Sequence, residues 1–216
     1  MGRPSLNAEA SLRVSRVGQE LATALRRYLN EQGIEQPYPL EFHLLDNSGK
    51  NQNSVNAFAL PGGQVFITEA LYRHLDKFDD GPLAGVLGHE IGHVLERHSS
   101  ERMASGGLMQ GLARAAGVAG GSYSSQQMAS MVTGLVHKSY GREQELESDG
   151  WGVRIMVYAG YNPEHLLTVM DVLERTSGGG GGPEFMSTHP RPANRKDYIR
   201  QIIGKYFPAG VPAELR

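Results

Sequence analysis

Apolar residues recur every three or four positions along much of the chain, and this spacing is typical of helices that bury one face. Between residues 5 and 31 it predicts one amphipathic helix that Gly33 ends. The same spacing predicts further helices over residues 71–78, 82–98, 138–159, 163–175 and 196–203. Pro82, with two aspartates shortly before it, is typical of a helix start.

Short segments of β-favouring residues lie early in the chain. Residues 37–46 and 54–61 flank a turn-rich stretch and predict a hairpin, and residues 64–68 predict a third strand after a Pro-Gly-Gly turn. We find no internal repeat. Strands that precede most of the helices predict an α+β fold, with a mainly helical core and a small antiparallel sheet. A single domain over residues 1–216 suits this length.

Composition narrows the classes of function. The formal net charge is -2, so no overall basic field would attract nucleic acid, and we expect no nucleic-acid partner. Glycine, at 28 of 216 residues, is about twice as frequent as usual. It concentrates in two segments that we expect to be mobile, about 105–136 and 177–190.

The chain has no cysteine, which excludes disulfides, thiolate ligands and a catalytic thiol. Any metal must therefore be bound by histidine and carboxylate groups. No run of 18 apolar residues and no signal-peptide core occurs, so the sequence predicts a soluble chain without a transmembrane span. An export signal that had been trimmed from the chain would leave the same picture, so the compartment stays open.

The clearest chemical signal is the HExxH sequence from His89 to His93, inside the helix predicted over 82–98. Residues four apart share a helix face, so both imidazoles can bind one ion, with Glu90 beside them. Zinc suits such a ligand set, and a catalytic zinc keeps one position open for water. The alternative is a solvated helix face, against which Gly88 and Gly92 weigh.

A third ligand is expected on the helix that begins after residue 138. Glu145 and Asp149 lie four residues apart there, so one can bind the metal while the other supports a ligand histidine. Glu145 is our candidate for the ligand. The alternative is that Glu143, Glu145 and Glu147 form only a charged helix start that the helix dipole favours.

Four sequence blocks together resemble the gluzincin metallopeptidases, a family that includes the HtpX heat-shock protease, the yeast prenyl-protein protease and periplasmic quality-control homologues. The blocks are residues 56–68, 83–98, 141–163 and 187–195. The resemblance implies a zincin-like metallopeptidase domain and a zinc metalloendopeptidase acting on unfolded or misassembled proteins, with one Zn²⁺ per chain. Long apolar spans of the integral-membrane relatives are absent, so the chain resembles the small soluble members.

The resemblance also implies a role for each motif residue. His89, His93 and Glu145 would bind zinc, Glu90 would act as the general base, and Asp149 would support a ligand histidine. A further implication is an edge strand along which an extended peptide lies, formed by Asn56, Ala57, Phe58 and Ala59. An ordinary core strand is the alternative for these four residues.

Two further residues follow from the resemblance. His189 would lie near the metal and could be a fourth ligand in a self-inhibited state. Arg195 could face the same site, and either residue could stabilise the transition state. The alternative to a role at the metal is that His189 is an ordinary histidine in a turn before Pro190. The other histidines show no comparable pattern and are interpreted as surface or packing residues: His43, His74, His98, His137 and His165.

Two classes of function remain open from the sequence. One is the peptidase, with segment 105–136 as a lid or plug over the cleft, or as a contact for a hydrophobic partner. The other is a chaperone-like binding module of the cell envelope with a latent peptidase site. The resemblance favours the bacterial periplasm or envelope, where membrane-associated partners are available. A purely structural zinc is disfavoured, because such sites close with four ligands and need no Glu90.

Overall fold

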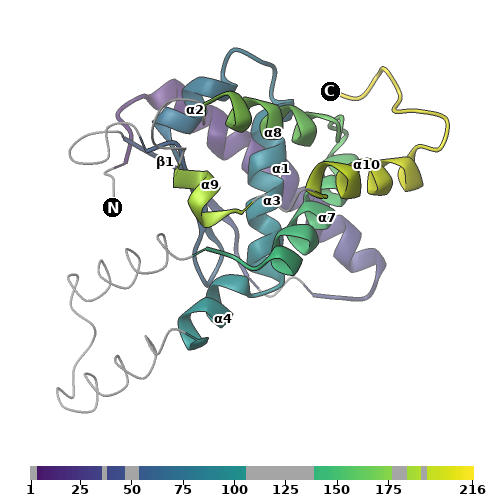
Figure 1. The fold of residues 1–216 in the computed structure, drawn as a ribbon, viewed down its shortest axis with the longest axis horizontal. Coiled ribbons are helices and arrows are strands. Elements are labelled where there is room, and N and C mark those ends of the chain that lie inside the picture. The colour runs from purple at the N-terminus through teal and green to yellow at the C-terminus, as the bar shows by residue number, and fades with distance from the viewer. Residues whose placement is uncertain (1–3, 36–37, 47–53, 106–138, 177–183, 191–193) are drawn as a thin grey trace.

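The computed structural model describes residues 4–35, 38–46, 54–105, 139–176, 184–190 and 194–216 (Figure 1). They form a mainly helical α+β fold, as the sequence predicts. The helices are α1 (Ala8–Glu31), α2 (Glu69–Leu75), α3 (Gly81–Leu95), α4 (His98–Ser105), α7 (Arg142–Ala159), α8 (His165–Thr176), α9 (Glu184–Thr188) and α10 (Arg195–Tyr206). The strands are β1 (Glu41–Leu45), β2 (Ala57–Ala59) and β3 (Gln64–Thr68).

The two segments predicted to be mobile lie mostly outside the described residues. Segment 105–136 falls there except for its first residue, which ends α4. Of segment 177–190, the part from 184 onward is described and contains the short helix α9.

The sheet differs from the predicted one. Its strand order is β1-β3-β2, with β1 parallel to β3 and β2 antiparallel to β3, so the sheet is mixed and the hairpin lies between β2 and β3. The tight turn explains this pairing, since Gly62 and Gly63 both adopt a φ of 103° that only glycine adopts readily. β2 therefore pairs with β3 on the side away from β1.

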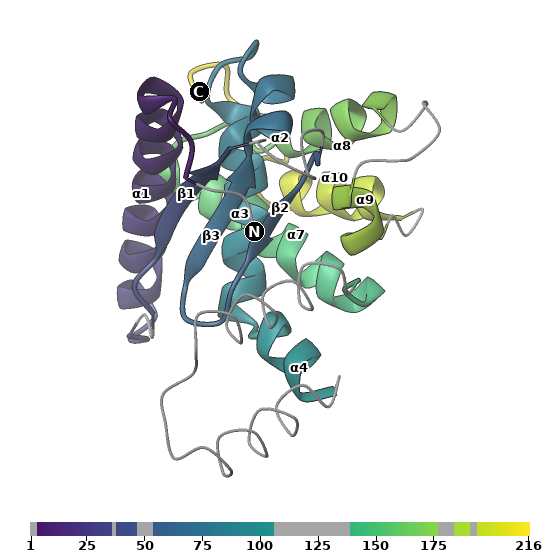
Figure 2. The same ribbon diagram turned by 90° about the vertical axis from the view of Figure 1, so that its left-hand side faces the viewer.

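Helix α1 packs alongside the sheet (Figure 2). It begins at Asn7, whose side chain accepts a hydrogen bond from the Ala10 N–H at 3.0 Å and so caps the first turn. Its apolar stripe is buried against β1, α3 and α7. The predicted amphipathic helix is therefore confirmed, with its start three residues later than expected.

Helix α3 lies at the centre of the fold, between the sheet on one side and α7 and α8 on the other. Every residue from Gly81 to Val94 is buried. A helix that is buried all round is a core element. The HExxH sequence therefore lies inside the protein, and the alternative of a solvated helix face is wrong.

The helix predicted over residues 82–98 is in fact two helices. It ends at Leu95, and Arg97 adopts a left-handed conformation with a φ of 57°, after which α4 begins at His98. A left-handed residue cannot continue a right-handed helix.

Among the described residues, no helix is both long and apolar enough to cross a membrane.

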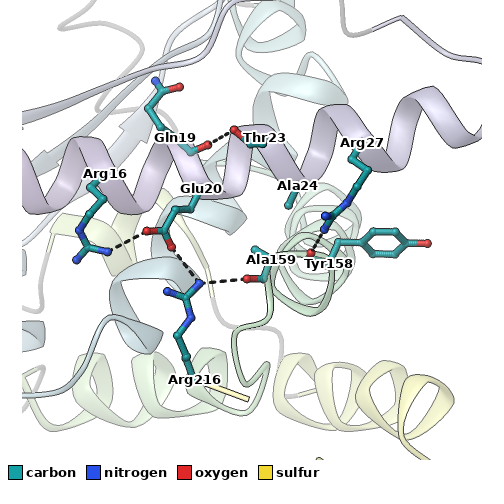
Figure 3. A pocket seen from close by; sticks show the side chains of 9 residues that line it. All are labelled: Arg16, Gln19, Glu20, Thr23, Ala24, Arg27, Tyr158, Ala159 and Arg216. Carbon is teal, nitrogen blue, oxygen red and sulfur yellow. Dashed lines mark hydrogen bonds and ion pairs between the residues drawn. The ribbon is translucent and has the colours of Figure 1, made fainter. Parts of the chain in front are cut away.

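The chain end packs against α1 beside a surface pocket (Figure 3). The Arg216 guanidinium lies 3.0 Å from Glu20 Oε2, which also accepts a hydrogen bond from the Tyr161 hydroxyl at 2.7 Å. Arg16 binds the other oxygen of Glu20 at 3.0 Å, and Arg27 donates to the Tyr158 carbonyl. The charged groups in this pocket are therefore paired with one another or with the backbone.

Candidate metal centre

Helices α3 and α7 cross so closely that their contact requires glycine. A Cβ atom on Gly92 would lie 2.8 Å from the Ser148 Cα, and one on Gly88 would lie 3.3 Å from the backbone of α7. The missing side chains allow α7 to approach the face of α3 that carries the two histidines. This approach brings Glu145 and Asp149 to the HExxH sequence.

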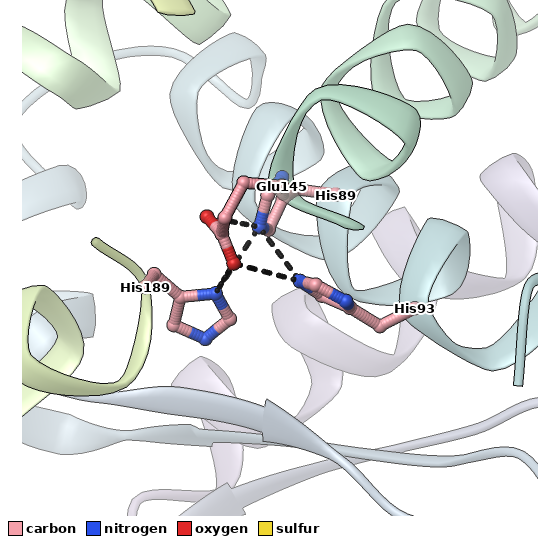
Figure 4. A group of neighbouring side chains, drawn as sticks. All are labelled: His89, His93, Glu145 and His189. Carbon is pink, nitrogen blue, oxygen red and sulfur yellow. Dashed lines mark hydrogen bonds and ion pairs between the residues drawn. The ribbon is translucent and has the colours of Figure 1, made fainter. Parts of the chain in front are cut away.

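Four side chains meet at this crossing (Figure 4): His89, His93, Glu145 and His189. All four are buried, and one ligand atom from each lies within 4.8 Å of the others. The Nε2 atoms of His89 and His93 are 3.1 Å apart, and His93 Nε2 is 3.4 Å from Glu145 Oε1. His189 Nδ1 lies 3.3 Å from His89 Nε2 and 3.0 Å from Glu145 Oε1.

These separations fit a metal ion. Ligand atoms around a tetrahedral zinc with bonds of about 2.0–2.1 Å are about 3.3 Å apart. His89 Nδ1 faces the Asp149 carboxylate, and a proton held there is the tautomer that would leave Nε2 free to bind a metal. Burial lowers the pKa of His93 well below its usual range, so this ring is neutral and also keeps a lone pair. Converging lone pairs in a buried site are the donor set that a cation requires.

Asp149 stands behind His89, in the position expected for a supporting carboxylate. Its Oδ1 lies 2.9 Å from His89 Nδ1, and Arg195 donates to both of its oxygens at 2.7 Å. Arg195 Nη1 also lies 2.5 Å from Glu145 Oε2. The structure thus places Arg195 against two carboxylates of the site, where it holds them in position.

The charge on Glu145 is stabilised by its neighbours. Burial alone would raise the pKa of this carboxyl, but His189, His93 and Arg195 outweigh burial and hold the pKa well below the usual range. Glu145 is therefore an anion inside the protein. An ionised buried carboxylate among histidine lone pairs is the charge that a divalent cation would balance.

Glu90 lies beside the cluster and is fully buried. Neither of its carboxylate oxygens has a hydrogen-bond partner among the described residues, although His189 Nε2 lies 3.4 Å from Oε1. Burial raises the pKa of Glu90. A carboxylate with free acceptor capacity next to a metal site is well placed to accept a proton.

His189 reaches the cluster from the end of α9. Its backbone N–H donates to the Phe185 carbonyl at 2.7 Å, and the two rings stack with centroids 4.2 Å apart. The histidine is completely buried. It is therefore packed into the site, although it lies in the bend between α9 and Pro190.

The residues predicted to form a substrate strand lie close by. Ala57, Phe58 and Ala59 form β2, an edge of the described sheet, and Asn56 precedes them. The Ala59 carbonyl accepts a hydrogen bond from Ser99 Oγ at 2.8 Å, while Asn56 Oδ1 is buried without a hydrogen-bond partner among the described residues.

Sequence reasoning missed Tyr140, which forms one wall of the site. Its ring stacks on His93 with centroids 3.6 Å apart, and its hydroxyl lies 3.0 Å from Ser99 Oγ. The Arg102 guanidinium covers the ring, 3.4 Å from its centroid. No spacing in the sequence links these residues, because they come from α4 and from the segment before α7.

Sequence reasoning also misjudged His98. It is 2% exposed, and its Nδ1 lies 2.9 Å from Nδ1 of His93, so it is a direct neighbour of the metal-site group. Its position five residues after His93 gave no signal of this contact, because a continuous helix would have placed His98 away from that ring.

The proteins to which this chain is similar are peptidases. The family model described as peptidase family M48 matches residues 13–203. The beta-barrel assembly-enhancing protease of Escherichia coli (strain K12) is 30% identical over 171 residues, which cover 73% of this chain and 33% of the relative. The mitochondrial metalloendopeptidase OMA1 of Saccharomyces cerevisiae is 31% identical over 157 residues, 70% of this chain and 44% of the relative.

A further relative is the metalloprotease YcaL of Escherichia coli (strain K12), 30% identical over 155 residues, 70% of this chain and 59% of the relative. The chain thus spans between a third and three fifths of the length of these three relatives. The family comparison supports the broader metallopeptidase family and does not single out its HtpX branch. With the match extending across α1 to α10, this chain belongs to peptidase family M48.

Proposed function

We propose that this chain is a zinc-dependent metalloendopeptidase that hydrolyses peptide bonds of unfolded or misassembled proteins. The observation that carries the proposal is the buried cluster of three histidines and Glu145, beside which the Glu90 carboxylate accepts no hydrogen bond from any described residue. Membership of a peptidase family supports the same reaction. A purely structural ion would need no free carboxylate at its side.

The chemistry divides among a few residues. His89, His93 and Glu145 would hold one zinc ion per chain, which when bound supplies Lewis acidity for polarising a carbonyl and acidifying a water. Asp149 fixes the tautomer of His89 through the 2.9 Å contact with Nδ1. Glu90 accepts the proton of the attacking water and delivers it to the leaving amine.

The substrate would bind as an extended strand along β2. Strand addition holds any sequence through main-chain hydrogen bonds, which suits unfolded proteins as substrates. Asn56 is 1% exposed and its Oδ1 has no hydrogen-bond partner among the described residues, so it could accept a hydrogen bond from a peptide N–H at the start of β2. Together, Asn56, Ala57, Phe58 and Ala59 form this proposed substrate edge.

We infer that His189 holds the site in a self-inhibited state. Its Nδ1 supplies the fourth ligand atom of the cluster, the position that a catalytic site keeps for water or substrate. Displacement of α9 would therefore precede turnover. The same observation favours the second candidate function, an envelope chaperone-like binding module whose peptidase site stays latent.

The bacterial periplasm or cell envelope is the compartment we propose. One similar protein is named a beta-barrel assembly-enhancing protease, and this name supports an envelope location because β-barrel proteins are assembled in outer membranes. Substrates would then be unassembled envelope proteins, some of them bound to membranes. Fractionation of cells that express the full-length protein tests this location.

The test of the proposed function measures bound zinc and casein hydrolysis in the same samples. The parent should hold one zinc per chain, His93→Ala should lose it, and Glu90→Gln should keep it while hydrolysis falls by about 10²–10⁴-fold. Glu96→Gln, the same change at an exposed position that ends α3, is the matched control.

Full hydrolysis by Glu90→Gln would overturn the role of this carboxylate. Zinc binding without hydrolysis in the parent and in His189→Ala would instead favour the binding module. A parent that binds no metal would overturn the proposal altogether.

A further inference from the structure

The ring of His93 has a second nitrogen that faces away from the metal cluster. Its Nδ1 lies 2.9 Å from Nδ1 of His98, and the other nitrogen of His98, Nε2, lies 3.0 Å from Oε2 of Glu147. The three side chains therefore form a hydrogen-bonded chain that starts at a proposed zinc ligand. It ends on a carboxylate of α7 that is 57% exposed.

The proton positions along this chain follow from the partners. With Nε2 of His93 turned toward the cluster, Nδ1 of that ring carries the hydrogen and donates it to His98. His98 then accepts at Nδ1, carries its own hydrogen on Nε2 and donates to Glu147. This is the one arrangement in which each nitrogen has a complementary partner and His93 keeps a lone pair for a metal.

The turn between α3 and α4 brings His98 to His93. Arg97 adopts a left-handed φ of 57°, which is uncommon for a residue with a side chain. The turn ends α3, and α4 then starts with His98. Strained backbone conformations of this kind persist where surrounding contacts fix them, often at functional sites.

Burial makes the contact consequential. His93 is 0% exposed and His98 is 2% exposed, so neither ring can replace a lost partner with bulk water. Ser148 Oγ, at 3.5 Å from His98 Nδ1, is too distant for a strong competing hydrogen bond. The His93 ring therefore depends on His98 for its tautomer and its orientation.

We propose that His98, supported by Glu147, positions His93 for metal binding. The inference rests on the proposed function, since it presumes a metal at the cluster. It gives each ligand histidine of α3 a supporting partner, because Asp149 contacts the outer nitrogen of His89 in the same way. His98 is a positioning residue that acts through His93.

The test compares zinc affinity, measured by competition with a chromophoric chelator, among variants of residue 98. His98→Leu fills the space without an acceptor, and its dissociation constant for zinc should rise by about 10–100-fold. His98→Asn places an amide oxygen near the position of Nδ1, and it should remain within about threefold of the parent. Rescue by asparagine is a result that a mere packing role would not produce.

The matched control is His165→Leu, which makes the same substitution at a half-buried histidine. His165 Nε2 lies 3.6 Å from Asp79 Oδ1, and the residue is distant in sequence from the proposed metal ligands. Unfolding midpoints of the zinc-free proteins, followed by circular dichroism, show that each variant folds. Glu147→Ala changes an exposed side chain, so it carries the test if the leucine variant does not fold. Its zinc affinity should fall by about fivefold.

The outcomes separate this inference from the proposed function. A parent without zinc affinity overturns both. Zinc binding by the parent and equally tight binding by His98→Leu, or by Glu147→Ala where the leucine variant is unfolded, overturns the positioning role alone. Equal losses in the leucine and asparagine variants also overturn it, because the acceptor would then be irrelevant.

Discussion

The His89 ring and the Asp149 carboxylate are joined at 2.9 Å in the interior, and Arg195 holds the same carboxylate through two further contacts at 2.7 Å. Arg195 is 3% exposed and Asp149 is 0% exposed, so the pair is a buried ion pair. Such a pair fixes geometry more than it adds stability. The pair lies behind His89, a proposed ligand. We therefore expect metal affinity to depend on Asp149 although this residue is not itself a proposed ligand.

We predict that Asp149→Ala weakens zinc binding by about 10–100-fold, because His89 loses the partner that fixes its tautomer. The zinc-free protein should also lose about 3–5 kcal/mol of unfolding free energy, since Arg195 keeps a buried charge with fewer partners. Chelator competition and urea unfolding measure the two effects. The control Asp171→Ala removes an exposed carboxylate bound to Lys196 and should change neither quantity much. An Asp149→Ala variant that binds zinc like the parent would contradict this role.

His189 provides the second prediction. Because its Nδ1 is one of the four converging ligand atoms, His189→Ala should free a coordination position and raise the rate of casein hydrolysis several-fold. Initial rates at saturating zinc measure this change, with Ser187→Ala on the same short helix as the control. A fall in kcat would mean instead that His189 stabilises the transition state.

The site could be predicted where the signal is local. The pair of histidines four residues apart, and the similar spacing of Glu145 and Asp149, follow from helix geometry alone. The resemblance supplied His189 and Arg195, whose segment is distant in sequence. The contacts of His98 were not predictable, because they depend on the left-handed Arg97, a residue type for which the sequence gives no sign of such a turn.

The fold, too, was predictable from local patterns and not from tertiary contacts. Apolar periodicity predicted α1, α3, α7, α8 and α10, with ends that differ by a few residues. The predicted topology of the sheet was wrong, because the direction of a strand is set by tertiary pairing and not by its own residues. The only sequence signs of the close crossing of α3 and α7 were glycines, Gly88 and Gly92 in α3 and Gly152 in α7, and their role is evident only once their neighbours are known.

The third prediction concerns that crossing. Gly92→Ala would gain about 1 kcal/mol of helix propensity, but its Cβ would lie 2.8 Å from the Ser148 Cα, and overpacking of this kind costs about 1–3 kcal/mol. We expect net destabilisation, and weaker zinc binding as α7 shifts Glu145 outward. Gly204→Ala in α10, with nothing within 4 Å of the added atom, should instead stabilise the protein. Urea unfolding of both variants decides the sign, and a stabilised Gly92→Ala would contradict the crossing.

The last prediction concerns pH and the start of α3. Asp80 lies 2.7 Å from Arg13 and from Arg16 of α1, and its side chain is 23% exposed. Burial alone would raise the pKa of Asp80, but its hydrogen bonds to the two arginines outweigh burial and lower it. A lowered pKa means that the contribution to stability is present above the unfolded value of about 3.9 and disappears as the pH falls through the folded value.

Asp80→Asn should therefore cost about 1–2 kcal/mol of unfolding free energy at pH 7 and much less near pH 3. Urea unfolding of the zinc-free protein at both pH values measures the difference without interference from metal release. Asp171→Asn is the matched control, because that carboxylate is 56% exposed and an exposed pair contributes little at either pH. A cost that stays constant between pH 7 and pH 3 would show that Asp80 acts through its shape and not through its charge. In that case the ion pairs of Asp80 with Arg13 and Arg16 would not stabilise the packing of α1 against the start of α3.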